Sequence, residues 1–115
     1  MRRVPYLVCA VIILVSASSS QAWAAGWKLQ TTPNPSANYN ALTAVTTTSA
    51  SNAWAVGYEG SNLGSSEVGL IEHYTGAWSV DSLPTAPGGL ELWGVKATSA
   101  SNVWAVGFTS PQNLP

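Results

Sequence analysis

Bulky and small residues alternate along residues 52–58 more clearly than anywhere else in the chain. Because successive side chains of a strand point to opposite faces of a sheet, this alternation predicts a β-strand with two unlike faces. The bulky and small sets are Trp54, Val56 and Tyr58 against Ala53, Ala55 and Gly57. Sheets stacked face to face, with the bulky side of one against the small side of the next, would satisfy both faces.

Three further short strands are predicted around this one. Residues 41–47 are rich in β-branched side chains, alternate apolar with small polar positions, and are followed by a turn of Ser and Asn. Residues 69–74 and 78–82 form a second pair of strands around a Thr-Gly turn, and a Pro/Gly-rich linker at 84–89 ends the unit. The order predicts an all-β fold with a four-stranded antiparallel sheet.

The strand at 52–58 lies inside a sequence that occurs twice. Residues 42–58, LTAVTTTSASNAWAVGY, return fifty residues later at 92–108 as LWGVKATSASNVWAVGF, with eleven of seventeen positions identical. A fixed period of this length is typical of repeat architectures, in which one unit cannot bury its apolar face alone. We therefore delimit a first repeat at 25–89 and an incomplete second repeat at 90–115.

The segment before the first copy resembles the last strand of the unit. Residues 27–30, WKLQ, are similar to residues 78–81, WSVD, and a proline follows each tryptophan six residues later. We therefore expect residues 27–30 to act as an outer strand.

Residues 1–24 have the layout of a secretory signal peptide. A basic head at 1–3 precedes an uncharged apolar run at 4–15, and an A-x-A sequence at 22–24 ends the segment. The apolar run is shorter than the roughly 20 residues of a membrane span, so stable membrane insertion after cleavage is not expected. A signal anchor is the competing interpretation. We expect a secreted, extracellular protein, exported by the general or the twin-arginine route.

The charge of the exported part limits the classes of partner that it is expected to bind, and its lack of cysteine excludes a disulfide. Removal of residues 1–24 leaves Lys28 and Lys96 against five carboxylates, a formal charge of −3. Nucleic acid and anionic membranes attract clustered Lys and Arg, so neither is expected as a partner. The only cysteine, Cys9, is lost with the predicted signal peptide, so the exported part forms no disulfide of its own.

The repeated string L-x-x-V-x-x-T-S-A-S-N-x-W-A-V-G, followed by G-L-I-E-H-Y-x-G-x-W, resembles WAVG-type repeats of secreted bacterial β-propeller proteins. It is similar, more distantly, to photosystem II assembly-factor-like and sialidase-type Asp-box propeller repeats. The resemblance spans residues 27–108 and implies antiparallel four-stranded propeller-type blades. The Asp-box itself is not matched, because the turn at 75–78 contains no aspartate.

The number of units is small for a propeller. The chain holds about 1.8 repeats, whereas propellers typically carry about 4–8 blades. We therefore expect a truncated member of a longer protein, or a subunit that needs self-association or missing blades to complete a ring.

Sequence signatures of catalysis, cofactor binding and metal binding are missing. Glu72 and His73 are the only adjacent carboxylate and imidazole, but neighbours in a strand point to opposite faces. A solvated strand with an occasional inward residue is therefore the simpler interpretation. One histidine and dispersed carboxylates give no zinc or calcium spacing. The sialidase-type arginine cluster has no counterpart after residue 24. We expect no catalytic residue, no cofactor and no metal site.

The tryptophans are the one set of residues with a possible role in binding. Trp93 stands where the first copy has Thr43, so the shared scaffold does not require it, and it is our ligand-binding candidate. A structural role in packing is the alternative interpretation. Residues repeated in phase or at strand ends are expected to be structural, and these are Trp54, Gly57, Trp78, Trp104 and Gly107.

The function expected from these features is binding without catalysis. We expect an exported β-propeller-type binding or scaffold module whose partner is a protein or a glycan. The alternatives are a fragment of an extracellular carbohydrate-active propeller enzyme and a non-functional truncated remnant. Fold alone does not choose between them, because propellers host many unrelated functions.

Overall fold

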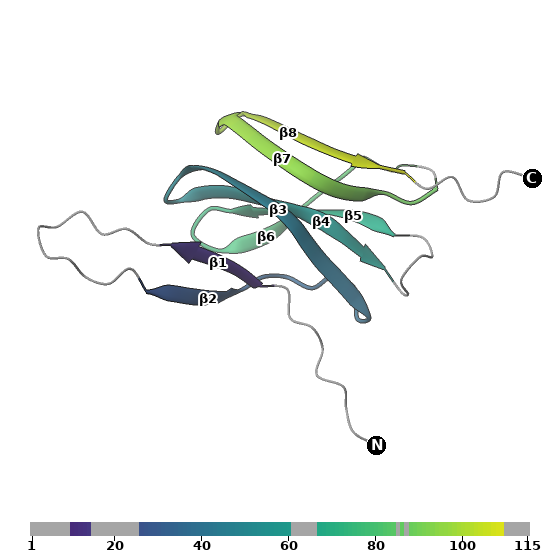
Figure 1. Ribbon diagram of the computed structural model, residues 1–115, viewed down its shortest axis with the longest axis horizontal. Coiled ribbons are helices and arrows are strands. Elements are labelled where there is room, and N and C mark those ends of the chain that lie inside the picture. The colour runs from purple at the N-terminus through teal and green to yellow at the C-terminus, as the bar shows by residue number, and fades with distance from the viewer. Residues whose placement is uncertain (1–9, 15–25, 61–66, 85, 87, 110–115) are drawn as a thin grey trace, which may run out of the picture.

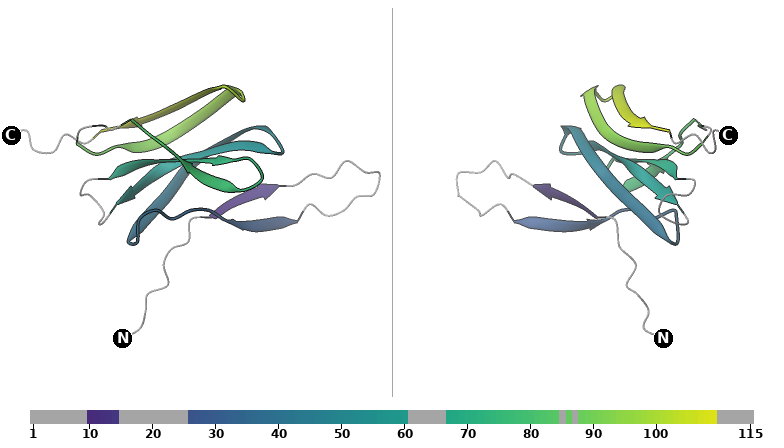
Figure 2. Two further views of the ribbon diagram at one scale, coloured as in Figure 1. Left: turned by 180° about the vertical axis from the view of Figure 1, so that it is seen from behind. Right: turned by 45° about the vertical axis from the view of Figure 1, so that its right-hand side comes forward.

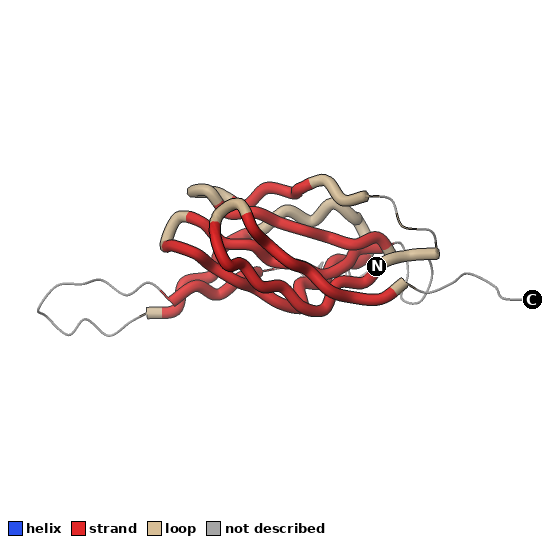
Figure 3. Tube along the Cα trace, turned by 90° about the horizontal axis from the view of Figure 1, so that it is seen from above, coloured by secondary structure: helices blue, strands red, loops and turns tan. Residues whose placement is uncertain are grey.

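The computed structural model describes residues 10–14, 26–60, 67–84, 86 and 88–109 (Figure 1). All regular structure in these ranges is antiparallel β-strand, and no helix occurs in them (Figure 3). The described part of the chain accordingly offers no helix able to cross a membrane. The all-β expectation is confirmed. Most of the predicted signal peptide and residues 110–115 of the second repeat lie outside the described residues, so those predictions stand as predictions.

The strands form three sheets. The largest contains, in spatial order, β3 (Tyr39–Ser49), β4 (Asn52–Gly60), β5 (Val68–Tyr74) and β6 (Trp78–Asp81). The two smaller sheets are hairpins, β7 (Glu91–Ser99) with β8 (Asn102–Phe108) and β1 (Ala10–Leu14) with β2 (Trp27–Thr31). The four strands of the large sheet lie where the alternation of side chains predicts them.

The two copies of the repeated sequence form hairpins with the same register. In β3–β4 the pairing shifts twice, and β7–β8 shifts at the positions fifty residues further on. The shifts fall between Leu42 and Ala44, Thr47 and Ser49, Leu92 and Gly94, and Ala97 and Ser99. The same sequence thus produces the same irregular hairpin twice.

The β7–β8 hairpin lies on one face of the large sheet, with β7 close to β3 and β4 (Figures 1 and 2). Hydrogen bonds between described residues join the hairpin to the sheet. The Thr43 hydroxyl lies 2.6 Å from the Leu92 carbonyl oxygen, and the amide of Ala97 donates to the Thr46 hydroxyl at 3.2 Å. The Thr43 hydroxyl also lies 3.0 Å from the carbonyl oxygen of Val56, so it can donate its single proton to either of the two carbonyl oxygens.

The opposite face of the large sheet carries an apolar cluster. Its buried members are Ala53, Ala55 and Trp78, and Leu42 and Tyr74 pack against them. The small residues of β4 therefore leave room for the aromatic rings of β5 and β6, which meet at a centroid distance of 5.3 Å. This is the packing that the small face of the strand permits.

Residues 27–30 form a strand, β2 (Trp27–Thr31), and its role as the outer strand of a further blade stays a prediction. In the structure β2 pairs with β1 over five positions and is not part of the large sheet, whose outer position β6 already occupies. One contact with that sheet comes from the Trp78 indole, which donates to Gln30 Oε1 at 3.1 Å. If residues 1–24 are removed as predicted, β2 loses β1 as its partner.

Candidate functional site

The outer face of the β7–β8 hairpin is the largest concentration of exposed aromatic and aliphatic side chains on the repeated strands. We define it by Trp93, Trp104, Val106 and Phe108, of which Trp104 is 67 % and Val106 65 % exposed. Their counterparts in the first copy, Trp54 and Val56, are only 5 % and 0 % exposed. The β7–β8 hairpin covers this face of the first copy, whereas no further described strand covers the outer face of β7–β8.

Trp93 lies at the rim of the outer face. It sits in the irregularity of β7, its indole donates to Glu91 Oε2 at 3.2 Å, and its ring centroid lies 5.8 Å from that of Tyr58. An open hollow of about 560 Å³ adjoins it, lined by Trp93, Gly94, Val106, Gly107 and Phe108. Trp93 therefore stands beside an apolar surface, with its polar atom already engaged. This environment suits a protein surface better than a sugar, which needs several hydrogen-bonding groups beside the stacking ring.

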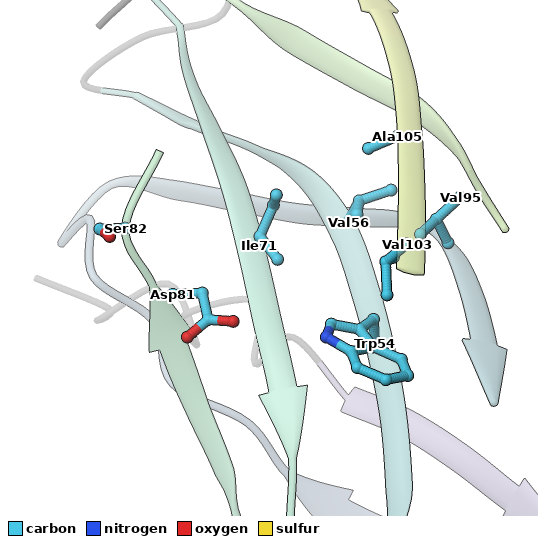
Figure 4. Close-up of a pocket in the computed structure, with 8 residues that line it drawn as sticks. All are labelled: Trp54, Val56, Ile71, Asp81, Ser82, Val95, Val103 and Ala105. Carbon is cyan, nitrogen blue, oxygen red and sulfur yellow. The ribbon is translucent and has the colours of Figure 1, made fainter. Parts of the chain in front are cut away.

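A second hollow lies between the β7–β8 hairpin and the large sheet (Figure 4). We call it the intersheet cleft. Its volume is about 400 Å³, and Trp54, Val56, Ile71, Asp81, Ser82, Val95, Val103 and Ala105 line it. The bulky face of β4 thus lies across the cleft from the small face of β8, as the alternation predicts.

His73 lies beside Trp54 on the face of the large sheet that borders the intersheet cleft. Its ring stacks on Trp54 with centroids 4.5 Å apart and planes 6° from parallel, and its Nε2 lies 2.6 Å from Asn52 Oδ1. The Nδ1 atom lies 4.0 Å from Asp81 Oδ2, which is too long for a hydrogen bond. Packing and one hydrogen bond therefore hold this imidazole in place.

Glu72 projects from the opposite face, where it pairs in register with Ala55 and Val80. Its side chain is 0 % exposed. Burial raises the pKa of this carboxyl to about 7, and the nearby Thr32 hydroxyl lowers the pKa in part. A solvated strand with an occasional inward residue is expected here, and Glu72 is such an inward residue.

The residues predicted to be structural divide into two groups. Trp54, Gly57 and Trp78 are buried in or against the large sheet, whereas Trp104 and Gly107 are exposed on β8. No cluster of three or more His, Cys, Asp or Glu side chains suited to a metal ion occurs in the described ranges.

Comparison with protein-family models, with curated proteins and with solved structures found no match.

Proposed function

We propose that the chain is an exported, non-catalytic binding or scaffold module of propeller-type blades, and that the outer face of the β7–β8 hairpin is its contact surface. The observation that supports this proposal is the unequal burial of two hairpins with nearly the same sequence. Trp54 and Val56 are covered by the next hairpin, and Trp104 and Val106 are not. Because the two hairpins have nearly the same sequence, we expect the exposed face of β8 to be covered by a partner as the equivalent face of β4 is covered by β7–β8.

The contact that we propose for the outer face is a further sheet, supplied by another copy of the chain. Contiguous apolar side chains exposed on a sheet are typical of association surfaces. A contact between two different faces of neighbouring copies is heterologous, so further copies add head to tail. Such an assembly closes into a ring if the rotation between neighbouring copies divides a full turn evenly. Self-association is therefore the first behaviour to test.

We expect the exported chain to associate in a concentration-dependent manner, and the double variant Trp104→Thr/Val106→Thr to remain monomeric. Threonine keeps the β-branched character of a strand residue while it removes the apolar surface. Sedimentation velocity over a range of concentrations measures the effect. The matched control is Val68→Thr, because Val68 is 56 % exposed on β5, outside the outer face. A monomeric wild-type chain at every concentration would contradict the proposal.

A further inference from the structure

We infer that residues 30–36 form a pH-sensitive strap, which closes over one face of the large sheet while Glu72 is protonated and opens when this carboxyl ionises. The strap runs from the end of β2 toward β3, on the side of the sheet away from β7–β8 (Figures 1 and 2). Its opening uncovers the apolar cluster around Trp78. The face concerned is therefore not the outer face of the β7–β8 hairpin.

Hydrogen bonds hold the strap at both ends, and one end is held more firmly. At the first end the Trp78 indole donates to Gln30 Oε1 at 3.1 Å. At the other end the Ser36 hydroxyl donates to the Gly60 carbonyl oxygen at 2.7 Å, and the Ser36 amide donates to Asn40 Oδ1 at 3.0 Å. The Asn40 side-chain amide in turn donates to the Ser36 carbonyl oxygen at 2.6 Å. The strap therefore has its hinge at Ser36 and its movable end at Gln30.

The composition of the strap and of β2 makes opening a local event. Pro33 and Pro35 have no N–H group, so this segment does not pair with the sheet as a regular strand. The apolar side chains of β2 are not buried against the sheet either, because Trp27 is 70 % and Leu29 78 % exposed. A segment with few buried apolar contacts opens at a lower cost than the whole fold. Opening thus leaves the four strands of the large sheet paired.

The strap covers the carboxyl of Glu72. Glu72 pairs in register with Ala55 and Val80, and its side chain is 0 % exposed. Thr32 of the strap is 3 % exposed, and its hydroxyl lies near this carboxyl. Burial raises the pKa of Glu72 to about 7, and the Thr32 hydroxyl lowers the pKa in part. Because an open strap returns the carboxyl to water, ionisation of Glu72 favours the open state.

Other titratable side chains lie on the same face or on the neighbouring strand. Tyr74 is on β5 and Glu59 on β4, and the exposed Lys28 is on β2. The described residues of β3, β6 and the strap that share this face are uncharged. The pKa of Glu72 is shifted by burial and by Thr32, so closure of the strap governs its ionisation.

The direction of the pH dependence follows from these pKa values. In the closed state the pKa of Glu72 is about 7, and in water it is 4.5, so the closed state holds a proton that the open state releases. Rising pH therefore favours opening. Between pH 5 and pH 8 the ratio of open to closed strap should rise by up to about 70-fold.

Hydroxyl-radical footprinting of the full chain at pH 5 and pH 8 tests the strap. Trp78 is 9 % exposed, and we expect it to react at least about tenfold faster at pH 8 than at pH 5. Trp54 is 5 % exposed and covered by the β7–β8 hairpin, so it should stay protected at both pH values and exclude unfolding of the whole sheet. The exposed Trp27 supplies the reference rate at each pH.

Three variants assign the effect to Glu72. Glu72→Gln is neutral at every pH and should keep Trp78 protected at both pH values. Glu59→Gln is the matched control, because it removes a carboxyl from the same face without touching the strap contact at Thr32, and it should retain the rise. Thr32→Val removes the hydroxyl that lowers the pKa of Glu72, so it should move the midpoint of the rise to higher pH.

Three results would overturn the inference. These are equal reactivity of Trp78 at both pH values in the wild-type chain, a parallel rise for Trp54, and a rise that persists in Glu72→Gln. Should Glu72→Gln fail to fold, Thr32→Val decides, and an unmoved midpoint in that variant overturns the inference.

Discussion

The substitution Gly57→Ala should lower the free energy of unfolding by about 3 kcal/mol. A Cβ at Gly57 would overlap the carbonyl oxygen of Ala41 and approach the Cα of Leu42, both in the paired strand β3. These are backbone atoms, so no side chain can move aside to make room. Relief requires a shift of the β3–β4 pairing on which the large sheet depends. Urea denaturation followed by circular dichroism measures the loss.

The matched control for Gly57→Ala is Gly26→Ala. A Cβ at Gly26 meets no atom within 4 Å, so this variant should stay within about 0.5 kcal/mol of the wild type. Gly107 repeats the geometry of Gly57, because its Cβ would overlap the carbonyl oxygen of Glu91. Gly107→Ala should therefore disturb the β7–β8 hairpin. A Gly57→Ala variant as stable as Gly26→Ala would show that the β3–β4 register differs from the one described.

The wild-type chain should lose about 3 kcal/mol of stability as the pH rises from 4.5 to about 7, and Glu72→Gln should abolish most of this loss. Burial raises the pKa of Glu72 from 4.5 to about 7 in the folded state. Between these values the folded state holds a proton that the unfolded state releases, so unfolding becomes more favourable with rising pH. Above about pH 7 the effect levels off, because the carboxyl is then ionised in both states.

Denaturant titrations of both proteins at a series of pH values measure this difference. At pH 4.5 the folded wild-type protein holds a neutral Glu72, so its stability should be close to that of Glu72→Gln, which provides the internal control. At pH 8 the variant should be the more stable of the two. Parallel curves for the two proteins over the whole range would mean that Glu72 is hydrated in the folded state.

The alternation of side chains predicts the strands well because it is a local property with a period of two residues. The residues from Trp54 to Tyr58 display it directly, and β4 forms there. The importance of Gly57 and Gly107 also follows from the sequence, since they occupy equivalent positions of the two repeat copies. Their reason is visible only in the structure, where the carbonyl oxygens of Ala41 and Glu91 occupy the space of a side chain.

Burial could not be predicted in the same way, because it depends on what covers each face. Trp54 and Trp104 have nearly the same neighbours in sequence, yet one is buried and the other exposed. Glu72 is a charged residue in a short strand, and its burial requires the opposite face of the sheet to be covered near Thr32. The pairing of β2 with β1 likewise joins residues with no shared pattern.

The most direct test of the proposed contact surface is oxidative footprinting of the tryptophans at low and high protein concentration. Trp104 should react quickly in dilute solution and become protected as the concentration rises. Trp54 is buried by the chain itself and should stay protected throughout, while Trp27, which is 70 % exposed on β2, should stay reactive. If Trp104 reacts equally fast at both concentrations, the outer face of the β7–β8 hairpin is not the surface through which the chain associates.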